Sequence, residues 1–413
     1  MAGFSKGFTQ EKLASIADGL VVALAVSLPW STSATSILAV FWLLALIPTL
    51  RWADIRREVS ALAGGLPVLL VVLGVVGMLW ADVTLLERWK GLDSLLKLLA
   101  IPLLFAQFRR SGNSEWVFVG YLVSCVALLA ATAIAMVTPL ASSLLHYDNV
   151  LVKHQSTQSG EFVTCIFGLL FLVSDAAERR KWLPLLGYAA IIFAMLVDIL
   201  YVSTGRTALI VALVLLVLFA IKRGLRAKGL AVAFGSAIII GGVVWTSSPF
   251  LRERTEAIQT ELQKYEATNA RTSSGERVEF WRKSIEFVRQ SPVFGHGTGS
   301  IRALFEKSAV GQTGAAGVAS TNPHNQTLAV AIQLGLVGVA VLWAMWIAHL
   351  LLFRGNSFAE WIGLVIVVQN IVGSLFNSHL FDFVQGWVYV VGVGVAGGIM
   401  SKVRATEKRQ EQR

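Results

Sequence analysis

The chain has 413 residues, of which 55% are hydrophobic and 15% are charged. Soluble domains carry about 25% charged residues, so this composition excludes an ordinary soluble protein. The apolar residues come in repeated blocks of about 17–25, the length that spans a bilayer core as a helix. They do not alternate with polar residues as the strands of a membrane β-barrel do. We therefore expect an all-α, polytopic integral membrane protein.

The apolar blocks predict twelve transmembrane helices. Their expected ranges are 14–30, 33–50, 62–80, 92–107, 115–137, 162–177, 183–202, 206–221, 229–248, 326–352, 357–376 and 383–400. The first block lacks a small-residue cleavage site, so we expect it to be a retained span and not a signal peptide. Cys125 and Cys165 lie within apolar blocks and are expected to be core residues, with no disulfide framework and no Cys-based metal site.

Positive charge predicts the orientation of these spans. More than half of the 35 Lys and Arg residues fall in the tail and in alternate connections, such as "RWADIRRE", "ERRKW" and "KRGLRAKG". Short loops rich in Lys and Arg stay on the cytoplasmic side, so both termini are expected there. The net charge of +10 is then mainly a signal of topology. It offers no basic soluble domain for nucleic acid.

This topology divides the chain into four parts. Residues 1–248 are expected to hold spans one to nine, 249–325 an outer loop, 326–400 spans ten to twelve, and 401–413 a basic cytoplasmic tail. Only the outer loop is long enough to hold extramembrane structure.

Two helices are expected in that outer loop. The first is "LRERTEAIQTELQKYEA". The second starts at the capping-box pattern Ser273-Ser274-Gly275-Glu276 and stops before Pro292. Its expected apolar stripe consists of Val278, Trp281, Ile285 and Val288. The following "FGHGTGS" is expected to be a tight turn and not a nucleotide loop, since no strand precedes it and no Walker lysine follows.

Two arginines of the expected outer layer stand out. Arg206 opens a span after a Ser-Thr-Gly turn, where an outside arginine opposes the usual charge bias. It is either a snorkelling interfacial residue or a ligand for an anion. Arg277 lies in the first turn of the second loop helix, where the helix dipole disfavours a cation. It needs a partner, either a nearby glutamate or a bound anion.

His324 lies in "NPHNQTL", at the outer end of the tenth span. Asn322 is suited to be the N-cap, with Pro323 at the first helical position. His324 would then lie in the first helical turn, where the dipole favours the neutral imidazole, the form that accepts a proton. The alternatives are a capping or interfacial histidine, or an anion held by the free N–H groups of the helix start.

Several further polar residues are expected in the same outer layer, each of which fits a structural pair better than a site on its own. They are Arg88, Lys90, Lys153, His154, Asp198, His379 and Asp382. Together they would form a cationic cavity that faces outward. The histidines are not spaced as i, i+4 pairs with carboxylates, so no catalytic zinc site is expected.

Three motifs resemble those of the O-antigen ligase family. "STGRTAL" is similar to its Ser-Gly-Arg segment, and "SGERVEFWRKSIEFVRQSPVFGHGTGS" to its loop signature, in which an Arg precedes a Trp by four residues. "NPHNQTL" is similar to its Pro-His-Asn segment. The resemblance extends to the topology of about twelve spans with one large loop, a GT-C-like glycosyltransferase architecture. It covers O-antigen polymerases and bacterial protein O-oligosaccharyltransferases as well.

The resemblance implies a glycosyltransferase of lipopolysaccharide biosynthesis in Gram-negative bacteria. An O-antigen glycan on undecaprenyl pyrophosphate, the donor, would pass to a sugar hydroxyl of lipid A-core, the acceptor. It implies that His324 is the base, that Arg206 and Arg277 bind the pyrophosphate, and that transfer is inverting without metal or cofactor. Arg88, Lys153, His154, Asn325 and Trp281 are weaker site candidates. Partners other than membrane lipids and the two substrates are not expected, and the protein is expected to be a monomer.

Three other functions fit parts of the pattern. A polymerase would use the same donor with a second lipid-linked glycan as acceptor. A protein O-oligosaccharyltransferase commonly carries a long C-terminal periplasmic domain, whereas this chain ends in a short basic tail. A transporter or flippase would show inverted repeats and broken helices paired across two halves, and the sequence indicates neither.

Overall fold

The structure, a computed structural model, describes residues 2–138, 150–151, 154–203, 205–224 and 249–411, with Gly235, Gly242, Trp245 and Thr246. Every regular element in these ranges is helical, which confirms the all-α prediction. The α-helices are α1 (Ala2–Ser27), α2 (Thr32–Leu46), α3 (Trp52–Ser60), α4 (Leu62–Gly77), α5 (Leu85–Leu96), α6 (Ala100–Phe108), α7 (Glu115–Val137), α9 (Gln155–Glu178), α10 (Trp182–Tyr201), α11 (Arg206–Lys222), α13 (Pro249–Thr268), α14 (Ser273–Gln290), α15 (Ile301–Ala309), α16 (Gln326–Leu352), α17 (Phe358–Gly373) and α18 (Phe383–Glu411).

Seven helical segments of the described chain are long and apolar enough to cross a membrane. The count rises to eight if α3 and α4, bent by 89° at their junction, form one broken span. The seven segments match the spans expected at 33–50, 92–107, 115–137, 162–177, 183–202, 326–352 and 383–400. A polytopic helical membrane protein is therefore confirmed.

The other five expected spans have different outcomes. The span at 62–80 is α4, the longer arm of the bent pair, and the one at 14–30 falls largely within α1. Those at 206–221 and 357–376 are α11 and α17, helices of 17 and 16 residues. The last, at 229–248, lies almost wholly outside the described residues. The number of twelve spans stays a prediction.

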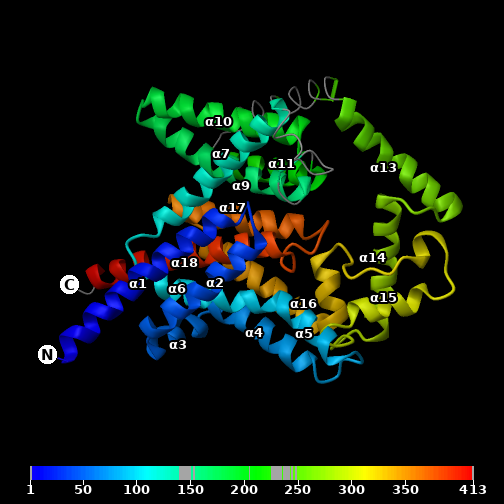
Figure 1. Cartoon of the computed structure of the whole chain (residues 1–413), viewed down its shortest axis with the longest axis horizontal. Coiled ribbons are helices and arrows are strands. Elements are labelled where there is room, and N and C mark those ends of the chain that lie inside the picture. The colour runs from blue at the N-terminus through cyan, green and yellow to red at the C-terminus, as the bar shows by residue number, and fades with distance from the viewer. Residues whose placement is uncertain are drawn as a thin grey trace.

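One hydrophobic core connects the membrane helices, with α18 at its centre. Figure 1 shows α18 in the middle of the bundle near α6 and α17, and 83% of its apolar segment is buried. Gly394, Gly397 and Gly398 leave no room for a Cβ against the side chains of α6. Small residues at a helix interface allow two backbones to approach closely. Cys125 and Cys165 are buried free thiols in α7 and α9, as expected.

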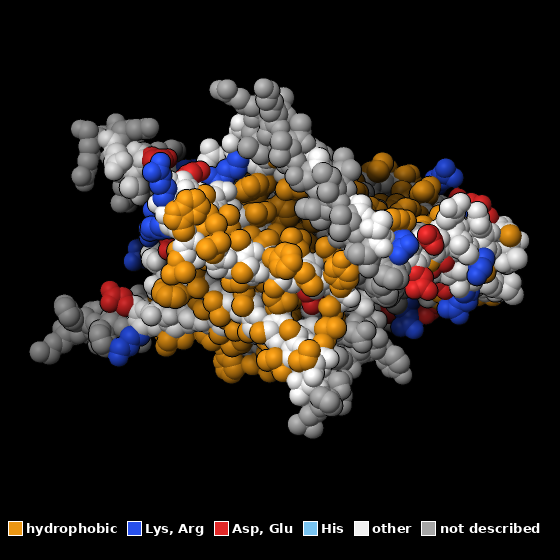
Figure 2. Space-filling view, turned by 90° about the horizontal axis from the view of Figure 1, so that it is seen from above, with side chains coloured by type: hydrophobic (Ala, Val, Ile, Leu, Met, Phe, Trp, Pro, Cys, Tyr) orange, Lys and Arg blue, Asp and Glu red, His pale blue; other side chains and the backbone are white. Residues whose placement is uncertain are grey.

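The molecule has two distinct ends. Both termini lie at one end, whereas α13, α14 and α15 lie at the opposite end (Figure 1). Figure 2 shows hydrophobic side chains over the middle of the visible face, with Lys, Arg, Asp and Glu towards the two ends. An apolar band between two charged ends is the surface expected of a protein that crosses a bilayer.

Helices α13 and α14 confirm the two helices predicted within residues 249–325, but two details of the α14 prediction were wrong. Thr272 is the N-cap, one residue before the expected capping box, and its side chain accepts a hydrogen bond from Gly275 N. The expected apolar stripe is not the buried face, because Val278 and Ile285 are 39% and 45% exposed. The buried aromatic residues are Phe280 and Phe287, which pack edge-to-face on Phe305 of α15.

The "FGHGTGS" segment is the tight turn that was predicted, and it also fills a break in α16. The backbone of α16 leaves the helical conformation at Gly335, where φ is 62° and ψ is −163°. The N–H groups of His296 and Gly297 donate to the carbonyls of Ile332 and Gln333, and Leu336 N donates to Pro292 O. Non-helical backbone within a membrane-spanning segment is tolerated when other parts of the protein supply hydrogen-bond partners. The sequence did not reveal this broken helix, and the loop closes the break.

Candidate functional site

His324 lies in a loop before α16 and not in its first turn, so the expected helix start was wrong. Asn325 is the N-cap, and its Oδ1 accepts a hydrogen bond of 3.0 Å from Leu328 N. Asn322 instead accepts the N–H of His324 at 2.8 Å in a tight turn. His324 itself has a φ of 54°, a left-handed conformation that is uncommon for a residue with a side chain. Such strain clusters at functional sites.

The ring of His324 is held on two sides. Its Nδ1 lies 3.1 Å from Oδ1 of Asn377, in the loop between α17 and α18. The imidazole stacks on the ring of Phe280 in α14, with centroids 6.1 Å apart and planes inclined by 21°. Three elements therefore fix the position of this side chain, namely the loop before α16, the loop before α18 and the helix α14.

Burial lowers the pKa of His324, and the positive charge of Arg277 lowers it further. The hydrogen bond with Asn377 and the charge of Glu276 oppose this shift to a smaller extent. The imidazole is therefore neutral at pH 7, as predicted from the sequence. The main physical cause, however, is burial and not the dipole of α16.

Arg206 is the first residue of α11, as predicted, and the turn before it is fixed by neighbouring helices. Ser203 Oγ donates to the carboxylate of Asp198 at the end of α10. A Cβ at Gly205 would collide with Ser159 of α9, so only glycine allows this approach. Asp198 thus has the structural role expected of it, and the turn places the half-buried Arg206 at the end of the bundle that carries α14.

Arg277, in the first turn of α14, lies near Arg206. Burial lowers the pKa of Arg277, and the second largest cause is the positive charge of Arg206. Within the described part of the chain, neither guanidinium has a hydrogen-bond or ion-pair partner in the protein. The negative charge of Glu261 opposes this shift of the Arg277 pKa to a smaller extent. Two adjacent half-buried cations without a counter-ion form an environment that favours a bound anion.

Two cavities adjoin the loops that carry His324 and Asn377. The first, of about 130 Å³, is lined by Arg277, Asn377, His379, His154 and residues of α9 and α11. Burial lowers the pKa of His379 to about 4, so it is neutral. Asp382 lines both cavities.

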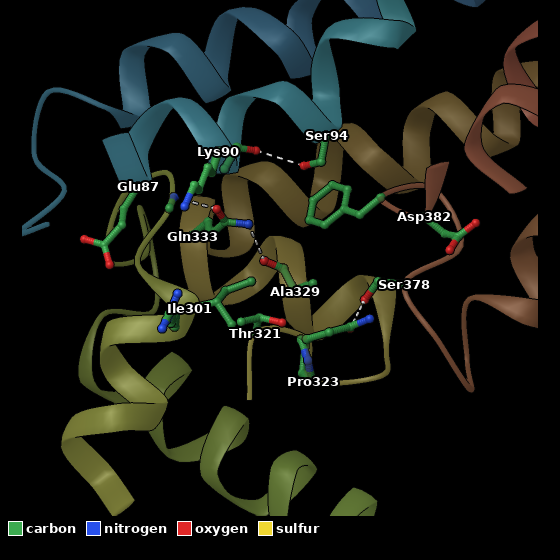
Figure 3. Close-up of a pocket in the computed structure, with 15 residues that line it drawn as sticks. Glu87, Lys90, Ser94, Ile301, Thr321, Pro323, Ala329, Gln333, Ser378 and Asp382 are labelled. Atoms are coloured by element: carbon green, nitrogen blue, oxygen red, sulfur yellow. Dashed lines mark hydrogen bonds between the residues drawn. The ribbon is translucent and has the colours of Figure 1, made fainter. Parts of the chain in front are cut away.

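The second cavity has a volume of about 340 Å³. Figure 3 shows Glu87 and Lys90 of α5 on one side of it and Pro323 and Ser378 across from them. Most of its lining groups are hydroxyls, amides and charged side chains. Pro323 and its neighbour Asn322 form its wall next to His324.

The weaker candidates from the sequence have different environments. Arg88 donates to the carbonyls of Met78 and Val83 and so closes the loop before α5. Asn325 caps α16, as described above. Trp281 lies on α14, and its buried Nε1 has no hydrogen-bond partner among the described residues. His154 is the N-cap residue of α9 and lines the smaller cavity, whereas Lys153 lies outside the described residues.

Sequence reasoning missed Asn377 and Ser378. They occur in "LFNSHLFDF", a polar interruption between two apolar segments. That interruption was the available signal, but within it only His379 and Asp382 were predicted to belong to the outer polar layer. The described residues contain no group of three or more His, Cys, Asp or Glu side chains that could hold a metal ion.

The fold and this site define a polytopic helical membrane protein with a cationic, histidine-containing site at one end of its bundle. Residues 189–343 match the sequence profile of a family described as O-antigen ligase. This part of the chain, 155 of its 413 residues, is therefore similar to O-antigen ligases. The matched range includes Arg206, Arg277 and His324, which the sequence analysis had singled out.

The chain is also similar to an uncharacterized protein of Haemophilus influenzae. The two are 24% identical over 226 residues, which is 54% of this chain and 54% of that relative. The chain thus matches about half of the length of the curated relative.

Proposed function

We propose that the protein transfers an O-antigen glycan from undecaprenyl pyrophosphate to a sugar hydroxyl of lipid A-core, in the periplasmic leaflet of a bacterial inner membrane. The observation that carries the proposal is the pair Arg206 and Arg277, two neighbouring guanidiniums that form no ion pair with any described residue, next to the neutral His324. The similarity of residues 189–343 to O-antigen ligases supports glycan transfer as the reaction class.

The pyrophosphate of the donor would bind at the arginine pair. Guanidinium groups bind phosphate oxygens with charge-assisted, often bidentate hydrogen bonds. Once its charge is held, pyrophosphate is a good leaving group and needs no general acid. The smaller cavity beside Arg277 offers room for part of this group.

His324 would act as the general base. A sugar hydroxyl is a poor nucleophile, so its proton must leave as the new bond to the anomeric carbon forms. A neutral imidazole can accept that proton, and such assistance contributes about 10²–10⁴ in rate. The bond between the anomeric carbon and the pyrophosphate oxygen breaks in the same step, with inversion.

The acceptor sugar is proposed to occupy the cavity of about 340 Å³. This volume is within the range of about 300–1,000 Å³ that is usual for small-molecule sites. Its amides, hydroxyls and charges of both signs suit a polyhydroxylated ligand. Asn322 and Pro323, which directly precede His324 in the chain, line this cavity.

The lipopolysaccharide profile of a deletion strain tests the proposed reaction. Loss of long-chain lipopolysaccharide, with glycan accumulating on undecaprenyl pyrophosphate, is the expected result. Complementation with the intact gene should restore the long chains. Core that carries a single O-unit would instead identify a polymerase, and an unchanged profile would contradict both activities.

A further inference from the structure

Two asparagine side chains connect the backbone of His324 to its own ring. The N–H of His324 donates to Oδ1 of Asn322 at 2.8 Å, and Ser378 Oγ donates to the same oxygen at 2.7 Å. Nδ2 of Asn322 donates to Oδ1 of Asn377 at 3.1 Å. That oxygen also lies 3.1 Å from Nδ1 of His324. The hydrogen bonds form a closed circuit between two loops.

The circuit fixes the orientation of each amide in turn. A backbone N–H can only donate, so the oxygen of Asn322 must face His324, and its NH₂ group must face Asn377. The oxygen of Asn377 must therefore face that NH₂ group, and it is the same oxygen that meets the ring. Because an amide oxygen only accepts, Nδ1 of His324 must carry the hydrogen.

We propose that Asn377, oriented by Asn322, is a positioning residue that holds His324 in the Nδ1–H tautomer and so leaves Nε2 as the proton acceptor. The inference rests on the proposed role of His324 as the base. It identifies the ring nitrogen that takes the proton. It also identifies the residue, in the loop before α18, that determines which nitrogen is available.

The remaining contacts of the ring agree with this assignment. Nε2 has no hydrogen-bond partner in the described part of the chain, and the stack on Phe280 restricts rotation of the imidazole. During transfer, the proton of the acceptor hydroxyl would pass to Nε2 as the glycosidic bond forms and the pyrophosphate leaves. The resulting imidazolium donates from Nδ1 to Asn377 and then releases the Nε2 proton to water.

Ring ¹⁵N chemical shifts of the purified full-length protein test the tautomer directly. Protein labelled with ¹⁵N-histidine contains six histidines, and a His324→Gln variant identifies the signals of His324 by difference. Near pH 7.5 we expect a protonated Nδ1 and an unprotonated Nε2. The Asn377→Leu variant should show a second population with the proton on Nε2. A proton on Nε2 in the unmodified protein would overturn the inference, as would an unchanged spectrum in Asn377→Leu.

Steady-state transfer kinetics test the consequence for the reaction. Partners that orient metal-ligating histidines affect activity about 10- to 100-fold, and we expect a fall of this size in kcat for Asn377→Leu. The KM for the donor should change much less. Asn356→Leu, an exposed change near the opposite end of the bundle, is the matched control for membrane insertion. A rise in donor KM at constant kcat would assign Asn377 to substrate binding and contradict the inference.

Asn377→Asp separates positioning from simple packing. A carboxylate accepts from Nδ1–H as the amide oxygen does, so this variant should keep the tautomer and most of kcat. The charged groups already acting on the ring are Arg277 and Glu276, both from α14. A new negative charge beside them should raise the pKa of His324 and move the acidic limb of the kcat profile upward by about one unit or more. An unshifted limb would contradict direct contact between residue 377 and the ring.

The two proposals fail in different ways. If the His324→Ala variant transfers glycan normally, the base assignment fails whatever the tautomer is. If that variant is inactive but Asn377→Leu leaves both the ¹⁵N spectrum and kcat unchanged, only the positioning role of Asn377 fails.

Discussion

Two half-buried arginines distinguish one end of the bundle from the other. At the end with the termini, Arg109 pairs with Glu58, Arg223 pairs with Glu178 and lies over Phe171, and Lys222 donates to two carbonyls of the α16–α17 loop. At the opposite end, Arg206 and Arg277 lie beside each other without a partner in the described chain.

The presence or absence of a protein partner distinguishes arginines that stabilise the fold from arginines that are available to a ligand. A half-buried guanidinium loses hydration, and protein partners normally replace it. Where no partner is present and a second cation adds repulsion, the arrangement costs stability. A bound anion would remove that cost, which explains why the end with these two arginines is the candidate site.

The largest effect is expected from the substitution His324→Ala. Removal of the base should reduce transfer by about 10²–10⁴-fold, while the protein inserts and folds normally. The measurement is the rate of glycan transfer by purified protein, with the lipopolysaccharide profile in cells lacking the chromosomal copy. Normal ligation would remove His324 from the mechanism.

Replacement of Arg206 or Arg277 by Lys keeps the charge but removes the fork that binds two oxygens. Loss of one charge-assisted hydrogen bond corresponds to about 1.5–3 kcal/mol, so kcat/KM for the donor should fall roughly 10- to 100-fold. Arg109→Lys at the other end is the matched control, because its partner is Glu58. Full activity of both site variants would show that the unpaired arginines do not bind the pyrophosphate.

Filling the larger cavity should affect the acceptor and not the donor. Ser94 of α5 lines this cavity, so Ser94→Trp should raise the KM for lipid A-core about tenfold, equivalent to about 1.4 kcal/mol. The KM for the lipid-linked donor should stay nearly constant. Ser94→Ala, which adds no volume, serves as the control. An increase in donor KM alone would place the donor, and not the acceptor, in this cavity.

The pH dependence of kcat should report the lowered pKa of His324. The base works only when neutral, so activity falls as the pH drops through its pKa. A histidine with the ordinary pKa of about 6.5 would be about one-quarter neutral at pH 6, which is a fourfold loss. Because burial and Arg277 lower the pKa, we expect a loss smaller than fourfold between pH 7.5 and pH 6. A fourfold or larger loss would contradict the neutral, buried imidazole.

Removal of a counter-ion at the end with the termini should affect stability alone. Glu58→Gln leaves Arg109 without its carboxylate and should lower the free energy of unfolding by about 1–3 kcal/mol. The thermal unfolding midpoint in detergent measures this loss, and the transfer rate at 25 °C should be unchanged. A large loss of transfer in the folded variant would contradict the conclusion that ion pairs at this end affect only stability.

The three residues predicted for the site lie near one another, but the local geometry around His324 differs from the prediction. Arg206 begins α11, Arg277 lies in the first turn of α14, and His324 lies close to Arg277, as the outer-layer reasoning indicated. The helix start at Asn322 was wrong, because Asn325 caps α16 while Asn322 binds the backbone of His324. Both asparagines have the chemistry of a cap, and only the path of the chain distinguishes them.

Local sequence patterns were sufficient to predict seven apolar spans of the described chain and to identify Arg206, Arg277 and His324 as site candidates. Hydropathy, caps and charge act over one or a few turns, so a local pattern specifies them. The tertiary structure alone decided the buried face of α14, the break at Gly335 and the contact between His324 and Asn377, which are 53 residues apart. Those features depend on which distant segments pack together and exchange hydrogen bonds. A local pattern along the chain cannot predict such long-range contacts.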